Sequence, residues 1–327
     1  MALLMYFKHF GLGKNPFLLN TTPDCMYYST SHCEAIAQLL YAVRDCKGIA
    51  LLMGEAGTGK TTLLHSILKL VLPVGAVAST ILNPMMETAE ELLGSVLAGF
   101  NVSAGRRPAM ELLSLLSGFL EEQARQGHRA ILVVDEAQLL SRRTLDNLRL
   151  ISNLESNGQR MIQLILSAQP EIREELSGNH HAALRQRMVA RCYLETLQPS
   201  EVWNYLALRI AHAGGDGRMI FHADAVEKLA AVSCCIPRVI NVVADNCLIA
   251  AFARKQERVD AALVSSVASH FELNPEIISG RKPVDMRPQY ERSPESWKKL
   301  VSQYASYELP ESLQKFADSL KFSQQVN

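Results

Sequence analysis

The sequence predicts an α/β fold, a parallel sheet with helices on both faces, followed by a small all-helical domain. Between residues 48 and 198, short apolar runs of strand length alternate with helical segments, as in parallel β-α-β units. One run, Ala130–Val134, is apolar at every position, which is typical of a strand covered on both faces. From Pro199 to Phe271, every segment favours helix.

Length and composition fit this prediction. The chain has 327 residues, of which 48% are hydrophobic and 20% charged, so it can bury the core of one large domain or two linked ones. Its 33 basic residues are balanced by 33 acidic ones. This balance argues against a chain-wide electrostatic hold on nucleic acid or on an anionic membrane, and leaves a local basic patch open.

The cysteines and the apolar segments indicate where the protein works. None of the seven cysteines forms a Cys-x-x-Cys pair, which argues against a zinc framework and a secreted disulfide scaffold. The N-terminus lacks a signal-peptide pattern, and the longest uncharged run, residues 70–86, is interrupted by prolines and polar residues. We therefore expect a cytoplasmic protein with reduced thiols and no direct membrane insertion.

The elements are expected in a definite order along the chain. Residues 1–47 are expected to form a loop-rich leader and then a helix, opened by Ser31 and Glu34 at capping-box spacing, that packs on the α/β domain. The α/β domain over 48–198 is expected to hold strands at 49–53, 76–82, 130–134, 163–167 and 192–194, and helices at 61–71, 88–100, 110–126 and 141–154. The helical domain over 199–273 is expected to hold helices at 201–211, 223–232, 238–255 and 261–271. Residues 274–327 are predicted to be a polar linker and tail, with short helical pieces at 294–304 and 311–320.

A phosphate-binding loop follows the first predicted strand. The pattern Gly-x-x-x-x-Gly-Lys-Ser/Thr is matched at every fixed position, and the loop comprises Gly54, Glu55, Ala56, Gly57, Thr58, Gly59, Lys60, Thr61 and Thr62. Glycine permits positive φ and lets backbone N–H groups approach phosphate oxygens without a Cβ in the way. We expect Lys60 to reach the β- and γ-phosphates of ATP, and Thr61 to bind Mg²⁺.

Two carboxylates end the apolar strand at 130–134. Asp135 and Glu136 would lie at the carboxyl edge of the sheet, where open α/β sheets bind ligands. Asp135 is expected to hold Mg²⁺, and Glu136 to act as the general base that polarises the attacking water. Alone, such a pair is common at strand ends. Together with the phosphate loop, it favours hydrolysis over nucleotide binding alone.

A polar residue follows the strand predicted at 163–167. If that strand lies beside 130–134, Gln169 is expected next to the γ-phosphate, with Ser167 as the alternative. The alternative, which we favour less, is that Gln169 is a polar turn residue without such a role.

Three arginines, Arg185, Arg187 and Arg191, precede the last predicted strand. An arginine from a neighbouring subunit can stabilise the charge on a transferring γ-phosphoryl group. On spacing alone, a solvated basic face is the better explanation of these three residues.

Taken in order, these motifs resemble the AAA+ ATPases, and within them the ExeA-like group (general secretion pathway protein A). The resemblance covers about residues 5–272, and the stretches that carry it are Tyr6–Phe17, Tyr27–His32, Gly54–Thr62, Val133–Gln138, Leu166–Glu171, Leu184–Arg187 and Ile236–Asn241. It implies a P-loop NTPase (AAA+) fold with a helical lid. The phosphate loop is shared by many families, whereas the ordered set is much more specific.

The resemblance also implies roles for single residues. Gln169 would be the sensor-1 residue, Arg187 the trans-acting arginine finger, and Arg238 the sensor-2 residue that reaches from the lid to the γ-phosphate. A helix N-terminal arginine without that role is the alternative for Arg238. One departure is Cys235, which stands where the group usually has glycine, so the entry to the lid is open to a different geometry. The family's ExeA continues into a membrane span and a peptidoglycan-binding domain, and neither is recognised in these 327 residues.

Three functional hypotheses follow. The first is a homo-oligomeric assembly ATPase for a secretion, pilus or exopolysaccharide system, with ATP at the subunit interface and a membrane-bound protein partner at the inner membrane. The second is a DNA-associated regulator of the transposition or replication-initiator type, for which the candidate basic residues are Arg106, Arg107, Arg142, Arg143 and Arg149. Neutral net charge and the lack of a recognisable helix-turn-helix make it the less favoured one. A small-molecule kinase is the least favoured, because an Asp-Glu pair and a lid arginine suit water activation.

Overall fold

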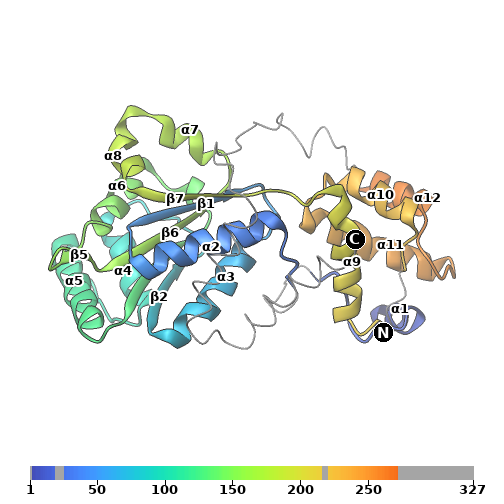
Figure 1. The fold of residues 1–327 in the computed structure, drawn as a ribbon, viewed down its shortest axis with the longest axis horizontal. Coiled ribbons are helices and arrows are strands. Elements are labelled where there is room, and N and C mark those ends of the chain that lie inside the picture. The colour runs from blue at the N-terminus through green and yellow to red at the C-terminus, as the bar shows by residue number, and fades with distance from the viewer. Residues whose placement is uncertain (1, 19–25, 216–219, 272–327) are drawn as a thin grey trace, which may run out of the picture. The chain divides into compact units, whose positions relative to one another are not determined.

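A five-stranded parallel sheet forms the centre of the α/β part of the protein (Figure 1). The computed structural model describes residues 2–18, 26–215 and 220–271. The strand order is β2-β3-β6-β1-β7, and the strands are β2 (Ala76–Ile81), β3 (Arg129–Val134), β6 (Ile162–Ala168), β1 (Ile49–Gly54) and β7 (Met188–Leu194). Every neighbouring pair is parallel. The predicted α/β fold is therefore confirmed, and the last strand begins four residues earlier than expected.

The central strands are apolar throughout because both faces of the sheet are covered. In β1, every residue is buried, and successive side chains point to opposite faces. Ile49, Leu51 and Met53 belong to one apolar cluster, whereas Ala50 and Leu52 belong to another. The continuous apolar runs in the sequence are thus the signature of a sheet between two helical layers.

Two sets of helices supply these layers. The helices α2 (Thr30–Asp45) and α3 (Lys60–Val71) contribute to the cluster that contains Ala50, and α4 (Ala89–Gly99), α5 (Ala109–Arg125) and α6 (Arg142–Ile151) to the cluster that contains Ile49. The helix α4 opens with a capping box formed by Thr88 and Glu91.

Several short elements were not predicted from the sequence. Two are the helices α7 (Ile172–Ser177) and α8 (Ala182–Gln186). The others are 3₁₀ turns at Leu72–Val74, Ala137–Leu139 and Asn179–His181, and a hairpin whose strands, β4 (Glu155–Ser156) and β5 (Gln159–Arg160), have two residues each. Asn157 and Gly158 join the hairpin strands, and both have positive φ. An Asn-Gly pair with positive φ at both positions is the favoured two-residue hairpin turn.

After the sheet, the described chain is helical. It comprises α9 (Pro199–His212), α10 (Ala223–Ser233), α11 (Pro237–Ala253) and α12 (Ala261–His270), which share one apolar cluster. The expected linker and tail at 274–327, with the helical pieces at 294–304 and 311–320, lie outside the described residues. No helix in the described ranges has the length and apolar character that crossing a membrane requires.

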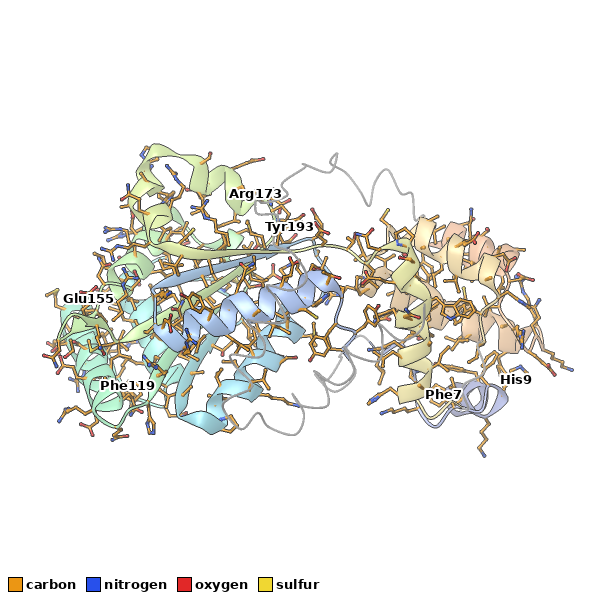
Figure 2. All side chains as sticks on the ribbon, in the orientation of Figure 1. Phe7, His9, Phe119, Glu155, Arg173 and Tyr193 are labelled. Atoms are coloured by element: carbon orange, nitrogen blue, oxygen red, sulfur yellow. The ribbon has the colours of Figure 1, made fainter. Side chains whose placement is uncertain are left out.

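The N-terminal leader differs from the expectation. It contains a helix, α1 (Ala2–His9), and its residues Tyr6, Leu12 and Phe17 belong to the cluster of α9–α12. The Tyr6 hydroxyl donates to Asp245 Oδ1 at 2.7 Å, and the ring of His9 lies 5.5 Å from that of Phe252, centroid to centroid. Figure 2 labels His9 and Phe7 on this helix. Of the described N-terminal residues, α2 and Met26 pack on the sheet, whereas Tyr6, Leu12 and Phe17 are buried by the helical region.

Candidate nucleotide-binding site

The strand order brings the predicted motifs to one edge of the sheet. The central strands β3, β6 and β1 are neighbours. Because they are parallel, their carboxyl ends meet at the same edge. The loop 54–62 follows β1 and leads into α3, Asp135 and Glu136 follow β3, and Gln169 follows β6. Residues that are far apart in the sequence therefore surround one position.

Glycine is required at three points of the phosphate loop. Gly57 has φ +83° and Gly59 has φ +103°, a backbone region that other residues rarely adopt. A Cβ on Gly54 would lie 2.7 Å from the carbonyl oxygen of Leu194, and one on Gly57 would lie 2.7 Å from Cβ of Arg238. None of these three residues therefore covers the backbone with a side chain, so its N–H groups are accessible to phosphate oxygens.

Lys60 is buried beneath this loop. Its side chain is only 6% exposed, and its Nζ donates to the carbonyl oxygens of Gly54 at 2.8 Å and of Glu55 at 3.0 Å. Burial lowers the pKa of Lys60, and the carboxylates of Glu136, Asp135, Glu55 and Glu171 act against that shift. A buried ammonium with two neutral carbonyl partners fits an anionic ligand such as a phosphate group, which would supply the missing negative charge.

Thr61 and Asp135 form a pair of oxygen ligands suited to a hard cation. The Thr61 hydroxyl donates to Asp135 Oδ2 at 2.6 Å, and Asp135 is 3% exposed. In the described part of the chain, no group of three or more His, Cys, Asp and Glu residues has a metal-binding arrangement. Mg²⁺ bound with a nucleotide commonly uses one or two protein ligands, and takes the others from phosphate and water. The two residues therefore fit Mg²⁺ held jointly with a triphosphate.

Glu136 is held by two glutamine amides. Its Oε2 accepts hydrogen bonds from Gln138 Nε2 at 2.5 Å and from Gln169 Nε2 at 3.2 Å. Glu136 also has φ +52°, a strained conformation for a non-glycine residue. The alternative to Gln169, Ser167, is fully buried in β6, and its hydroxyl has no partner within the described structure. The geometry thus favours Gln169 over Ser167 as the polar residue of this edge.

Gln138 is a residue to which the sequence analysis gave no role, although it ends the stretch Val133–Gln138. It bridges two motifs, because its Nε2 donates to Glu136 and its Oε1 accepts from the backbone N–H of Gln169 at 3.0 Å. Its position two residues after Glu136 is the one signal in the sequence that could have identified it.

Arg238 lies beside the phosphate loop. It is the second residue of α11, and its backbone N–H donates to the carbonyl oxygen of Gly57 at 3.3 Å. Its side chain is exposed. Cys234 and Cys235, which precede this helix, have φ +49° and +57°. Cys235 therefore keeps the backbone conformation that a glycine would adopt there without strain.

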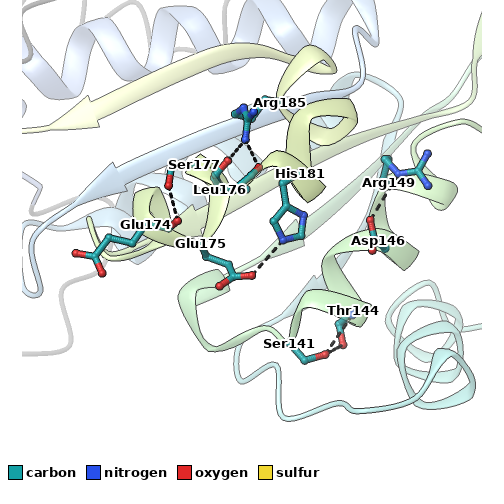
Figure 3. A network of polar contacts seen from close by, with 11 residues as sticks. Ser141, Thr144, Asp146, Arg149, Glu174, Glu175, Leu176, Ser177, His181 and Arg185 are labelled. Carbon is teal, nitrogen blue, oxygen red and sulfur yellow. Dashed lines mark hydrogen bonds and ion pairs between the residues drawn. The ribbon is translucent and has the colours of Figure 1, made fainter.

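The three arginines at 185–191 differ in their surroundings. The Arg185 guanidinium donates to the carbonyl oxygens of Leu176 and of Gly178, the latter at 2.6 Å (Figure 3). Arg191 is an exposed residue within β7, and its Nη2 donates to the carbonyl oxygen of Arg185 at 3.3 Å. Arg185 therefore holds the chain between α7 and α8 in place.

Arg187 lies near the amino ends of the sheet's strands, whereas the phosphate loop lies at their carboxyl ends. Its carbonyl oxygen accepts from the N–H of Ile49, the first residue of β1, whereas the loop begins at Gly54, the last residue of that strand. At the rise of a parallel strand, five residues span about 16 Å. No hydrogen bond or ion pair holds its guanidinium among the described residues. Arg187 is thus too far from the loop of its own chain to touch a nucleotide bound there.

A small pocket adjoins the loop, and apart from Thr58, Gly59 and Thr62 of the loop, the sequence analysis had assigned none of its lining residues to the site. The N-terminal segment, the loop and the helical region all contribute, through Met26, Tyr27, His32, Thr58, Gly59, Thr62, Leu197, Tyr205, Arg209 and Pro237. The lining combines aromatic and aliphatic side chains with the polar side chains of His32, Thr58 and Arg209. These residues are scattered along the chain without a common spacing, so no sequence pattern could have grouped them.

Comparison with known proteins defines the class. A family model described as an AAA domain matches residues 43–176. The solved structure of Cdc6p from Pyrobaculum aerophilum is similar with a TM-score of 0.63 and 18% identity, over 82% of this chain and 74% of that one. The Drosophila ORC bound to DNA is similar with a TM-score of 0.62 and 13% identity, over 100% of this chain and 84% of that one. At these identities, the two structures show the fold alone. The chain belongs to the AAA+ ATPases.

Within that family, the chain is similar to General secretion pathway protein A of Aeromonas hydrophila. The two sequences are 37% identical over 256 residues, which are 78% of this chain and 46% of that protein. This chain thus spans less than half the length of that relative. The resemblance to the ExeA-like group is confirmed. Nucleotide binding, usually with Mg²⁺, and ATP hydrolysis are general properties of AAA+ proteins.

Proposed function

We propose that this protein hydrolyses ATP to ADP and phosphate, and that the reacting phosphates bind at the carboxyl edge of the sheet. The observation that carries the proposal is the meeting of Lys60, Thr61, Asp135, Glu136 and Gln169 at that edge. The buried lysine and the bare loop suit the triphosphate, and the Thr61–Asp135 pair suits Mg²⁺. When bound, Mg²⁺ would neutralise charge on the phosphate oxygens.

Each residue has a defined part in the proposed reaction. The N–H groups of loop 54–62 and the Lys60 ammonium orient the phosphates and stabilise the negative charge that develops on them. Glu136 accepts a proton from the attacking water, and the amides of Gln138 and Gln169 keep its carboxylate at that position. Arg238, next to Gly57, connects the state of the nucleotide to the helical region.

The second part of the proposal is a homo-oligomer with ATP at the interface between subunits. Two points support it. Arg187 is remote from the loop of its own chain, and AAA+ proteins generally form oligomers. In such an assembly, Arg187 of one copy would complete the site of the next. Arg185 is the less suitable residue because backbone carbonyls already hold its guanidinium.

The third part concerns the biological process. The similarity to General secretion pathway protein A supports an assembly ATPase for a secretion, pilus or exopolysaccharide system. ATP-dependent work and free thiols suit the cytoplasm, and a membrane-bound protein partner would hold the ATPase at the inner membrane. The experiment is co-purification with membrane proteins after crosslinking in cells, with the Lys60→Ala variant as control. Recovery of no membrane protein would argue against this role.

A DNA-associated function is the alternative, and one observation favours it. The exposed Arg142 and Arg143 stand together at the start of α6. Two of the other candidate cations have carboxylate neighbours, since Arg149 Nε lies 3.8 Å from Asp146 (Figure 3) and Arg107 Nη1 lies 3.9 Å from Glu111. Binding of duplex DNA that weakens steeply with salt would support the alternative, and no binding at low salt would dismiss it.

The ATPase proposal is tested by calorimetry and by phosphate release. Wild-type protein should bind ATP with Mg²⁺ and release phosphate. Lys60→Ala should weaken nucleotide binding by orders of magnitude, because it removes the buried cation under the loop. Lys69→Ala, on the same helix α3, is the matched control and should bind like the wild type. A wild-type protein that takes up no adenine nucleotide, even with excess Mg²⁺, would refute the proposal.

A further inference from the structure

A histidine from outside the phosphate loop lies against the loop backbone. His32 belongs to α2 and is 2% exposed. Its Nε2 lies 3.2 Å from the carbonyl oxygen of Thr58, which is itself 1% exposed. A Cβ on Gly59 would lie 3.3 Å from the same nitrogen, so the ring is directly on the loop.

The partners of the ring decide where its proton lies. A carbonyl oxygen only accepts hydrogen bonds, so Nε2 carries the hydrogen and donates it to Thr58. The other nitrogen, Nδ1, then accepts from the Ser29 hydroxyl, whose Oγ is 2.6 Å away and 4% exposed. Burial lowers the pKa of His32 to about 4, with the bond to Thr58 acting against it, so the ring is neutral near pH 7. Both nitrogens are thereby satisfied.

The bond to Thr58 fixes one peptide plane of the cradle. In a trans peptide, the carbonyl and the N–H point in opposite directions. A Thr58 carbonyl held toward His32 therefore directs the N–H of Gly59 away from His32. Gly59 has φ +103° and no Cβ, so steric contacts of Gly59 itself do not restrict the orientation of the Thr58–Gly59 peptide plane. A hydrogen bond from another residue can fix that orientation.

We propose that His32 is a positioning residue that fixes the Thr58–Gly59 peptide, so that the Gly59 N–H donates to a nucleotide phosphate. Ser29 fixes the tautomer of the ring. The inference rests on the proposed nucleotide binding at loop 54–62. It makes the affinity for nucleotide depend on α2, a segment outside the phosphate-loop motif.

Two substitutions separate this role from simple packing. His32→Gln places an amide N–H near the position of Nε2, within reach of Thr58, whereas the shorter His32→Asn ends near the position of Nδ1. His32→Asn should weaken binding of both ATP and ADP about 3- to 10-fold, the effect of one lost hydrogen bond, and His32→Gln should restore most of it. Turnover at saturating ATP should also fall in His32→Asn, because the loop N–H groups stabilise the charge that develops on the phosphates, and His32→Gln should restore it.

The measurements are titrations of a fluorescent nucleotide analogue, steady-state phosphate release and thermal melts. Equal affinity in the wild type and both variants, or an equal loss in both variants, would overturn the proposal. If His32→Asn does not fold, imidazole ¹⁵N spectra of the wild type decide instead. A proton on Nε2 and none on Nδ1 supports the proposal, and the opposite tautomer refutes it. Absence of nucleotide binding by the wild type defeats the proposed function itself, which is a distinct result.

Discussion

The two edges of the parallel sheet are built differently. At the carboxyl edge, side chains from α3 and from the segments that follow β3 and β6 hold one another, through Thr61 with Asp135 and Gln169 with Glu136. At the amino edge, the Arg187 side chain has no polar partner in the described ranges, although its backbone is fixed by Ile49. The carboxyl edge thus holds a pre-assembled polar cluster, and the amino edge holds an arginine whose side chain has no partner in the described ranges. This combination is what a site shared between two copies of the chain would need.

The largest expected effect tests this comparison directly. Arg187→Ala should lower ATP turnover about 10³-fold or more, the usual effect of removing an arginine that stabilises γ-phosphoryl charge. Nucleotide affinity of the isolated chain should change little, because Arg187 is remote from its own loop. Arg191→Ala, an exposed arginine in the same segment, is the control and should keep its turnover.

Mixing makes the test sharper. A Lys60→Ala chain still offers Arg187, and an Arg187→Ala chain still offers an intact cradle. Mixed oligomers should therefore regain part of the phosphate release that each variant lacks alone. If no ratio of the two variants restores activity, the site does not lie between subunits.

The next effect concerns the carboxyl edge alone. Glu136→Gln should reduce turnover about 10²- to 10⁴-fold while ATP still binds, because the amide cannot accept the proton of the attacking water. Single-turnover phosphate release and nucleotide titration measure the two quantities separately. Unchanged turnover would remove Glu136 from the mechanism.

A smaller effect is a pH dependence of stability that originates at His32. Its pKa is about 4 in the folded protein and 6.5 as a free group, so below pH 6.5 the unfolded chain binds a proton that the folded chain does not. The contribution of neutral His32 to the unfolding free energy is therefore fully present above pH 6.5, and it is lost as the pH falls toward 4. Between pH 7 and pH 5, the wild type should lose about 2 kcal/mol more unfolding free energy than His32→Gln. Urea melts at both pH values measure this difference, and parallel losses would contradict the assignment.

The smallest effect is expected at the entry to α11, which places Arg238 next to the carboxyl edge. Cys235→Gly relieves about 1 kcal/mol of strain at φ +57° and loses a similar amount of apolar burial, so the unfolding free energy should change by less than about 1 kcal/mol. Cys247→Gly, in the middle of α11, should cost clearly more, because it adds a glycine to a helix interior. Equal losses at both positions would show that Cys235 is not strained.

The sequence alone predicted much of the fold because the strands of this sheet are buried on both faces. Their continuous apolar runs are visible without knowledge of their neighbours. The short helices α7 and α8 escaped prediction because six and five residues are too few to show a helical period. The helix α1 was missed for a related reason, since its aromatic side chains are buried by α9–α12 and not by the adjacent part of the chain.

What the sequence determined by itself is the chemistry of contiguous motifs. The glycines, Lys60 and Thr61 of the loop, and the Asp135–Glu136 pair, are recognisable because phosphate and metal chemistry dictates residue types at fixed short spacings. The tertiary structure decided how separate motifs meet, such as Gln169 on Glu136, His32 on Thr58 and Arg187 at the far edge. These arrangements depend on strand order and on helix packing, and both arise from contacts between residues that are distant along the chain.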